Sequence, residues 1–395
     1  MNNQSNAPYE IVANLFEQRR KAEALEVVAE HFRQARKYPE MFEALKGSIR
    51  QQLDLPVIYG GETEELPPET QQQLEDRLLA ACSTVGKLLL QDGQIAESWM
   101  YLRPLSNQQQ VRELLEAITV DEENVDEVIE VCLYQWAAPV FGYRVLLTHQ
   151  GTCNGITFFD TQATYQTPKI RNRLAEILTR HVHDELLSNV VKQLNEDSNQ
   201  VISKQEGLRS LVQHHASLFE NCGHHLDVTH LAAVVRIARF CEQQELLPMA
   251  LALCEYGKRL DPQLHYPGEP PFEQTYEDHL WFFKALSGEE VDQATKHFRA
   301  KHEDYQEQLF KTASQMALIE LMARTGQSKE AIECAIQLHT FESEQDNEAA
   351  VSMQTLIGLA ESERDIETLM KYFKSNDDLL GFSLAALQNE KSPVE

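Results

Sequence analysis

The sequence predicts an all-α protein of stacked antiparallel helical hairpins, with one irregular or short β-hairpin insertion near residues 139–168. Three observations support this fold class. Apolar residues recur three and four positions apart along most of the chain, as one face of a helix requires. Short breaks rich in glycine, proline and polar residues separate these stretches. Only residues 139–168 depart from this pattern of helical periodicity and short breaks.

The N-terminal part, residues 1–135, is predicted to hold several helical hairpins. Residues 9–53 form two helices with a break at residues 36–39, and the proline- and glycine-rich residues 54–70 form a surface loop. Residues 70–105 form a hairpin that turns at residues 91–93. A third pair, residues 111–118 and 125–136, brackets an acidic run that suits the start of a helix.

The central part, residues 136–230, begins with the insertion. Residues 139–168 are rich in glycine and threonine, and apolar residues alternate at Val145 and Leu147 and again at Ile156 and Phe158. The segment is either a small β-hairpin or an ordered loop that crosses the helices, and the loop is favoured. A helix resumes at Lys169, and residues 208–219 form another.

The strongest hairpin opens the C-terminal part, residues 231–390. Residues 231–241 and 247–257 each have an apolar face, and the linker between them is too short for anything but an antiparallel return. Pro262 ends the second helix. Further helices are predicted at residues 276–286, 289–301, 312–324, 329–339, 353–362, 366–373 and 379–387, and Ser287 with Glu290 predicts a capping box before the second of these.

This hairpin resembles a tetratricopeptide repeat, whose length is about 34 residues. With Pro262 as the last signature position, Ala238, Ala250 and Gly257 fall on the small-residue positions of that family. The aromatic positions depart from the pattern, since they hold Val234, Cys241 and Cys254. The resemblance implies an α-solenoid with a concave surface that binds a peptide or a protein.

The same spacing of small residues recurs weakly at Gly86 with Gly93 and at Gly326 with Ala331. Two further segments, residues 99–105 and 225–239, resemble an uncharacterised bacterial family. That second resemblance implies a bacterial origin.

Composition narrows the classes of function. The chain has 395 residues, with 62 acidic and 35 basic side chains and a net charge of −27. This balance opposes nucleic-acid phosphates and anionic membranes, so a basic protein or peptide is the electrostatically favoured partner. The seven cysteines include no CxxC pair and predict buried free thiols. No leader or membrane segment is apparent, so a cytoplasmic location is expected.

Histidines in the central part could bind a metal. His181 and Glu185 lie one turn apart on a predicted helix, the spacing of two-ligand helical sites. His225, Asp227 and His230 enter the next helix, so Asp227 is either its N-cap, accepting from the amide of His230, or a third ligand beside the two histidines. In the metal hypothesis these five residues hold a divalent transition metal such as zinc.

Other reactive groups carry weaker signals. His214 and His215 are adjacent and would face different directions on a helix. Cys153 lies in a predicted glycine-containing loop four residues after His149, but no third catalytic group accompanies them, which favours a structural thiol. His149 could instead join the metal hypothesis from a neighbouring element.

The sequence lacks the common nucleotide-binding motifs and the GxSxG motif of serine hydrolases. The leading hypothesis is therefore a cytoplasmic helical-repeat scaffold that binds a protein or peptide through a concave surface and has no chemistry of its own. The alternative is a metal-binding protein, or a metal-dependent enzyme, with a His/Asp/Glu site in residues 149–230.

Overall fold

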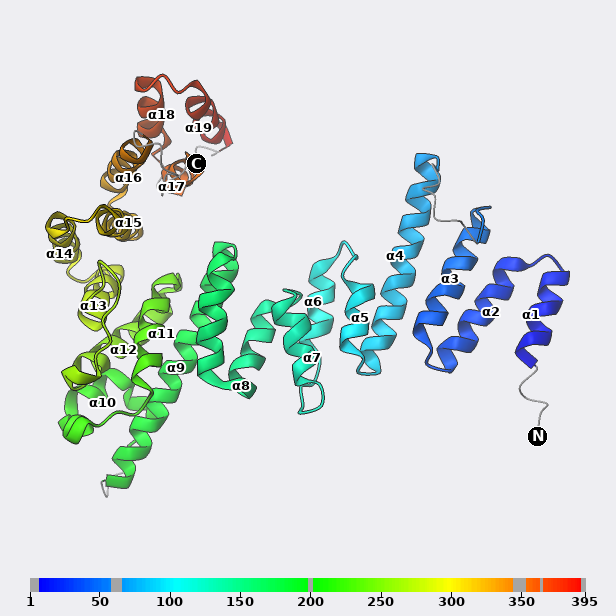
Figure 1. Cartoon of the computed structure of the whole chain (residues 1–395), viewed down its shortest axis with the longest axis horizontal. Helices are drawn as coiled ribbons and strands as arrows, with labels where there is room; N and C mark the ends of the chain where they lie inside the picture. The colour runs from blue at the N-terminus through cyan, green and yellow to red at the C-terminus, as the bar shows by residue number, and fades with distance from the viewer. Residues whose placement is uncertain (1–6, 58–65, 198–201, 344–352, 363–364, 392–395) are drawn as a thin grey trace. The chain divides into compact units, whose positions relative to one another are not determined.

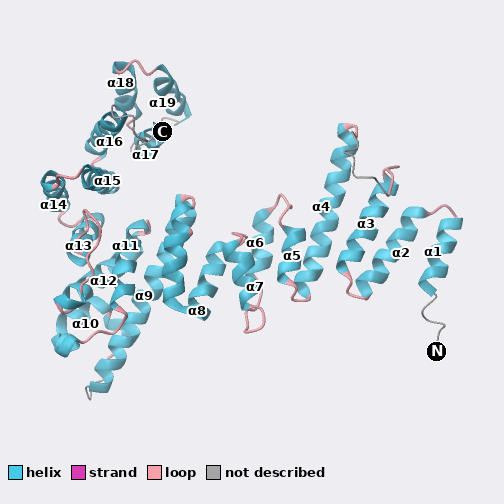
Figure 2. Cartoon of the chain, viewed as in Figure 1, coloured by secondary structure: helices cyan, strands magenta, loops and turns pink. Residues whose placement is uncertain are grey.

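The computed structural model describes residues 7–57, 66–197, 202–343, 353–362 and 365–391. Every regular element in these residues is helical, as Figure 2 shows, so the all-α prediction is confirmed. None of the described helices has the length and apolar character needed to cross a membrane. The chain divides into two compact units, residues 1–151 and residues 152–395. The predicted three-part division stays a prediction.

In the first unit, each of the first four helices packs on the next one in the chain (Figure 1). Its helices are α1 (Ala7–Glu17), α2 (Lys21–Gln34), α3 (Tyr38–Gln52), α4 (Pro68–Gln91), α5 (Ile95–Leu102), α6 (Gln108–Glu116) and α7 (Val125–Ile129), with a π-helical turn at Glu130–Tyr134. The hairpin of α4 and α5 is confirmed. A Cβ on Gly86 would come within 2.6 Å of the Leu102 side chain, so this glycine allows the two helices to approach closely.

Helix α8 (Pro139–Thr161) begins in the first unit and passes into the second at Gly151. In the second unit follow α9 (Pro168–Asp197), α10 (Leu208–His214), α11 (Val228–Ile237), α12 (Leu247–Arg259), α13 (Thr275–Leu286), α14 (Val291–Asp304), α15 (Gln308–Arg324), α16 (Ser328–Ser343), α17 (Met353–Ser362), α18 (Ile366–Ser375) and α19 (Leu379–Lys391). Helix α9 contacts α10, α11 and α12, and from α12 to α19 each described helix packs on the next. The helical pairs predicted after residue 231 are therefore present.

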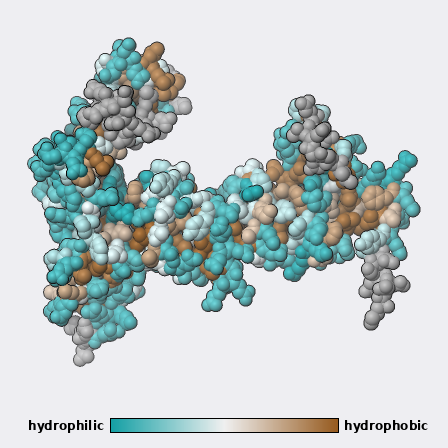
Figure 3. All heavy atoms as spheres, viewed as in Figure 1, coloured by the Kyte–Doolittle hydropathy of each residue, from teal (hydrophilic) through white to brown (hydrophobic). Residues whose placement is uncertain are grey.

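Buried apolar residues lie between neighbouring helices, which is what the periodicity predicted. One cluster joins α2, α3 and α4 around Tyr38, Val85 and Leu89. Another joins α15 to α19 around Leu356 and Phe373. Most of the surface visible in Figure 3 is hydrophilic, with hydrophobic patches over the N-terminal helices and near α19.

The predicted insertion at residues 139–168 is wrong: α8 occupies most of this segment, a 3-10 turn follows at Ala163–Tyr165, and α9 begins at Pro168. Its glycines do not mark a loop. Gly151 takes φ +82°, which kinks α8, and a Cβ on Gly142 would lie 2.8 Å from the backbone of Leu133. Val145 and Leu147 seemed to alternate as in a strand, but Leu146 between them is buried too, because the helix is enclosed on several sides.

Two smaller predictions also fail. Residues 9–53 form three helices, because Arg19 takes φ +62° and ends α1 before α2 begins. The capping box of Ser287 and Glu290 is absent, since Glu290 itself precedes α14 in a left-handed conformation, with φ +53°. The Ser287 hydroxyl instead donates to the carbonyl of Phe283, and Glu290 pairs with Lys284 at 2.9 Å.

Candidate functional site

The structure brings together two of the five predicted metal ligands. His181 and Glu185 lie one turn apart on α9, and both face Thr152 of α8. The Thr152 hydroxyl donates to Glu185 Oε2 at 3.1 Å and lies 3.2 Å from His181 Nε2. Because a hydroxyl has one proton, it can accept only from a protonated His181 Nε2 while it donates to Glu185.

His225 is held by Tyr256 rather than by the other predicted ligands. The Tyr256 hydroxyl accepts from the backbone N–H of His225 at 2.9 Å and lies 2.8 Å from its Nδ1. Burial, and to a smaller extent His224, lowers the pKa of His225, so its ring is neutral at pH 7. Its Nε2 is buried and has no hydrogen-bond partner within the described structure.

Asp227 acts as the N-cap of α11, one of the two alternatives that the sequence left open. Its carboxylate accepts from the Thr229 hydroxyl at 2.6 Å and from the Thr229 amide at 2.8 Å, and the predicted amide of His230 contributes more weakly. These two hydrogen bonds lower the pKa of Asp227. His230 follows on α11 and is half-buried.

Cys153 and His214, two of the remaining reactive groups, lie on α8 and α10. Cys153 is exposed on α8 rather than in a loop, and His214 is exposed, with its Nδ1 2.9 Å from the carbonyl of Ser210. All seven cysteines are free. Burial raises the pKa of both Cys132 and Cys241 to about 12, so neither is a thiolate at neutral pH.

No three histidine, cysteine, aspartate or glutamate side chains converge in the described part of the chain. Zinc sites usually hold the ion with three or four protein ligands. With only His181 and Glu185 close together, we expect less than one zinc ion per chain after dialysis of tag-free protein, measured by mass spectrometry of the metal content. One zinc ion per chain that is lost in His181→Ala would contradict this expectation and restore the metal hypothesis.

A groove of about 810 Å³ lies in the second unit between α9, α13, α15 and the segment after α11. Its lining combines three arginines, two glutamates, two further polar residues and several apolar side chains. The lining residues are Arg171, Asn172, Arg239, Phe240, Glu242, Gln244, Leu286, Ala313, Met316, Ala317, Glu320, Ala323 and Arg324.

Two of the three arginines are committed to the protein itself. Glu320 of α15 accepts from Arg239 at 2.6 Å and from Arg324 at 3.1 Å. Burial raises the pKa of Glu320, but the two arginines outweigh burial and the net pKa is lowered. Arg324 also donates to the carbonyls of Arg239 and Cys241, each at 2.6 Å, and thereby ties α15 to the end of α11.

Arg171 of α9 is the arginine of the groove that forms no ion pair within the described residues. Its guanidinium carbon lies 4.5 Å from the centre of the Phe240 ring, and its Nε donates to Asn172 at 3.4 Å. Burial is the main cause that lowers its pKa. Glu320 and Glu242 favour its charged form, but no described carboxylate forms an ion pair with Arg171. Glu242 accepts from the Asn172 amide at 2.5 Å.

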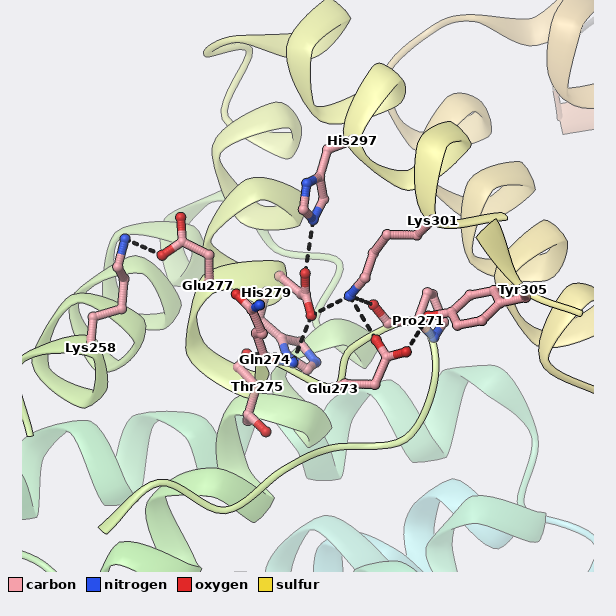
Figure 4. A network of polar contacts seen from close by, with 11 residues as sticks. Lys258, Pro271, Glu273, Gln274, Thr275, Glu277, His279, His297, Lys301 and Tyr305 are labelled. Atoms are coloured by element: carbon pink, nitrogen blue, oxygen red, sulfur yellow. Dashed lines mark hydrogen bonds and ion pairs between the residues drawn. The ribbon is translucent and has the colours of Figure 1, made fainter. Parts of the chain in front are cut away.

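A second polar cluster, drawn in Figure 4, surrounds Asp278 of α13, which is 1% exposed. Its carboxylate accepts from Lys301 at 2.6 Å and from the backbone N–H of Gln274 at 2.9 Å, and it lies 2.8 Å from His297 Nε2. Lys301 also pairs with Glu273 at 2.7 Å. Every charged group of this cluster has a partner inside it, so we assign the cluster to the attachment of α14 and residues 271–274 to α13.

Sequence reasoning did not identify the groove or the Asp278 cluster. Their members are separated by up to 153 positions, from Arg171 to Arg324, and carry no motif. The one available signal was the position of Arg239 and Arg324, each at the end of a predicted helix. Such arginines are ordinary helix-terminal cations by sequence alone.

No family model, no curated protein and no solved structure matches this chain. The function of the groove therefore has to be argued from its own chemistry.

Proposed function

We propose that the chain is a cytoplasmic, tetratricopeptide-like helical-repeat scaffold that binds a protein or peptide partner in the groove between α9, α13 and α15. The single observation that carries this proposal is the groove itself, about 810 Å³ in volume and lined by helices on both sides. Helical pairs that stack in sequence leave surfaces of this kind, on which an extended peptide can lie.

The chemistry of the lining supports a peptide as occupant. Met316, Leu286 and Phe240 offer apolar surface, and methionine in particular adapts to side chains of different shape. Arginines beside that surface supply directed hydrogen-bond donors. Interfaces between proteins are enriched in aromatic residues, methionine and arginine in the same way.

Blocking the groove tests the proposal. Ala313 of α15 lines the groove and is half-buried, so Ala313→Trp would fill space that a peptide needs. We expect peptides selected from a random display library on the full chain to bind this variant at least about 10-fold more weakly, since one lost anchor contact costs about 1.4 kcal/mol or more. Binding is measured by fluorescence polarisation.

Ala300→Trp is the matched control, because Ala300 is exposed on α14 and does not line the groove. It should bind the selected peptides like the wild type. Both variants should keep the wild-type circular dichroism spectrum. Failure to select any peptide, or equal binding by Ala313→Trp and wild type, would refute the groove as a binding site.

A further inference from the structure

The groove differs in charge from the chain that contains it. Its lining holds three arginines and two glutamates, a net charge of +1 by subtraction, whereas the whole chain has a net charge of −27. Glu320 is already shared by Arg239 and Arg324, and Glu242 accepts from Asn172. Arg239, Arg324 and Glu320 together therefore carry the net positive charge. Arg171 lies near Glu242 but forms no ion pair with it, so its terminal N–H donors have no carboxylate acceptor in the described structure.

The side chain of Arg171 is preorganised to bind a carboxylate. Its guanidinium is stacked near Phe240 at 4.5 Å, so part of the entropy cost of ordering this long side chain is met before a ligand binds. The plane of a guanidinium presents paired N–H donors that match the two oxygens of a carboxylate. Partial burial, which lowers its pKa, also strengthens its attraction for an anion that enters the groove.

We propose that Arg171 binds the side-chain carboxylate of a single aspartate or glutamate in the partner peptide, next to an apolar residue that packs on Met316 and Leu286. This inference rests on the proposed function and names the partner chemistry that the groove selects. Met316 and Leu286 line the same groove as Arg171. An acidic side chain and an apolar neighbour can therefore be bound together.

The surrounding charge limits the partner to one acidic group at this position. Charges more than about 8 Å apart are largely screened at physiological salt, so the groove acts on a bound carboxylate locally. A run of acidic residues, or the phosphates of a nucleic acid, would extend over a surface whose net charge is strongly negative. The basic partner predicted from total charge stays a prediction for the surface outside the groove.

A pair of synthetic peptides tests the inference. One is a peptide selected on the full chain, and the other has its acidic residue replaced by asparagine or glutamine. We expect the replacement to weaken binding to the wild type about 10-fold, because a charge-assisted bidentate pair is lost. On Arg171→Gln the two peptides should bind within about 2-fold of each other, because the partner of the carboxylate is absent.

Two further variants make the result specific. Lys192→Gln removes one positive charge from an exposed site on the same helix, about 30 Å along its axis, and should keep the full preference for the acidic peptide. Arg171→Lys retains the charge but not the planar fork, and should keep only part of the preference. This second variant also provides the test if Arg171→Gln fails to fold.

The outcomes separate this inference from the proposed function. Selected peptides without an acidic residue that bind wild type and Arg171→Gln equally, yet lose binding in Ala313→Trp, would overturn the inference and leave the groove as a binding site. An equal loss of preference in Lys192→Gln and Arg171→Gln would overturn it as well, because the effect would then be nonspecific attraction. Absence of any selected peptide would overturn both.

Discussion

Asp278→Ala is expected to lower the free energy of unfolding of the second unit by about 3 kcal/mol, the lower end of the cost of breaking a buried ion pair. Asp278 is 1% exposed and accepts from Lys301, from the Gln274 amide and, when His297 Nε2 is protonated, from His297. Its removal leaves these donors without their acceptor. In this variant Lys301 can still pair with Glu273, which lies 2.7 Å away, and its side chain is 21% exposed. Both features limit the loss of stability.

Urea unfolding of the full chain, followed by tryptophan fluorescence, measures this effect. Trp281 lies on α13 with its ring 5.9 Å from that of His297, so it reports on the cluster directly. Glu367→Gln is the control, because Glu367 and its partner Lys371 are 79% and 72% exposed, and such pairs contribute about 0–1 kcal/mol. A loss below about 1 kcal/mol in Asp278→Ala would contradict the structural role assigned to this cluster.

Gly257→Ala is expected to destabilise the chain by about 1–3 kcal/mol, the usual cost of overpacking a filled core. A Cβ at this position would lie 2.3 Å from the ring of Tyr276, which is 2% exposed and cannot move into solvent. Alanine gains about 1 kcal/mol over glycine in a helix, but that gain is smaller than the cost of this clash. The measurement is the urea midpoint of the full chain.

Gly358→Ala makes the same chemical change at an open site. It should raise the free energy of unfolding, whereas Gly257→Ala should lower it. Gly358 is exposed on α17, and among the described residues outside its own stretch of helix no atom lies within 4 Å of the position of its Cβ. We expect a gain of about 0.5–1 kcal/mol from helix propensity alone. Gly257→Ala should also cost less when Tyr276 is replaced by alanine, and equal effects of the two glycine substitutions would contradict the close approach of α12 and α13.

The packing around Gly257 shows which features of the fold can be predicted from the sequence. Gly257 falls on a small-residue position of the repeat pattern, and a neighbouring helix approaches it closely. The neighbour, however, is Tyr276 of α13 rather than a residue of α11. Periodicity shows which face of a helix is apolar, but not which other helix covers that face.

The errors have a related cause. Glycine is common both in loops and at points where another segment packs closely on a helix. Within residues 139–168, Gly142 lies at such a close contact and Gly151 lies at a helix kink. Ser287 and Glu290 have the spacing of a capping box, yet a left-handed Glu290 lets its carboxylate reach Lys284 instead. In each case a contact with a neighbouring segment decided the local conformation.

For the candidate site residues, the sequence correctly placed His181 and Glu185 on one face of a helix. His181 and Glu185 face the same side of α9 because four residues make about one turn, which is a local property. Asp227 could be identified as an N-cap for the same reason. Whether His225 and His230 joined them depended on how two separate helices pack, and His225 lies against Tyr256 instead.

The sequence by itself determined the all-helical class, most helix boundaries and the apolar faces, because these follow from interactions among residues within one or two turns. Only the tertiary structure decided that Arg171, Arg239 and Arg324 meet in one groove, that two of them share Glu320, and that Arg171 forms no ion pair in the described structure. Those three arginines come from separate helical segments. Their meeting depends on packing between those segments, to which no local pattern of residues is sensitive.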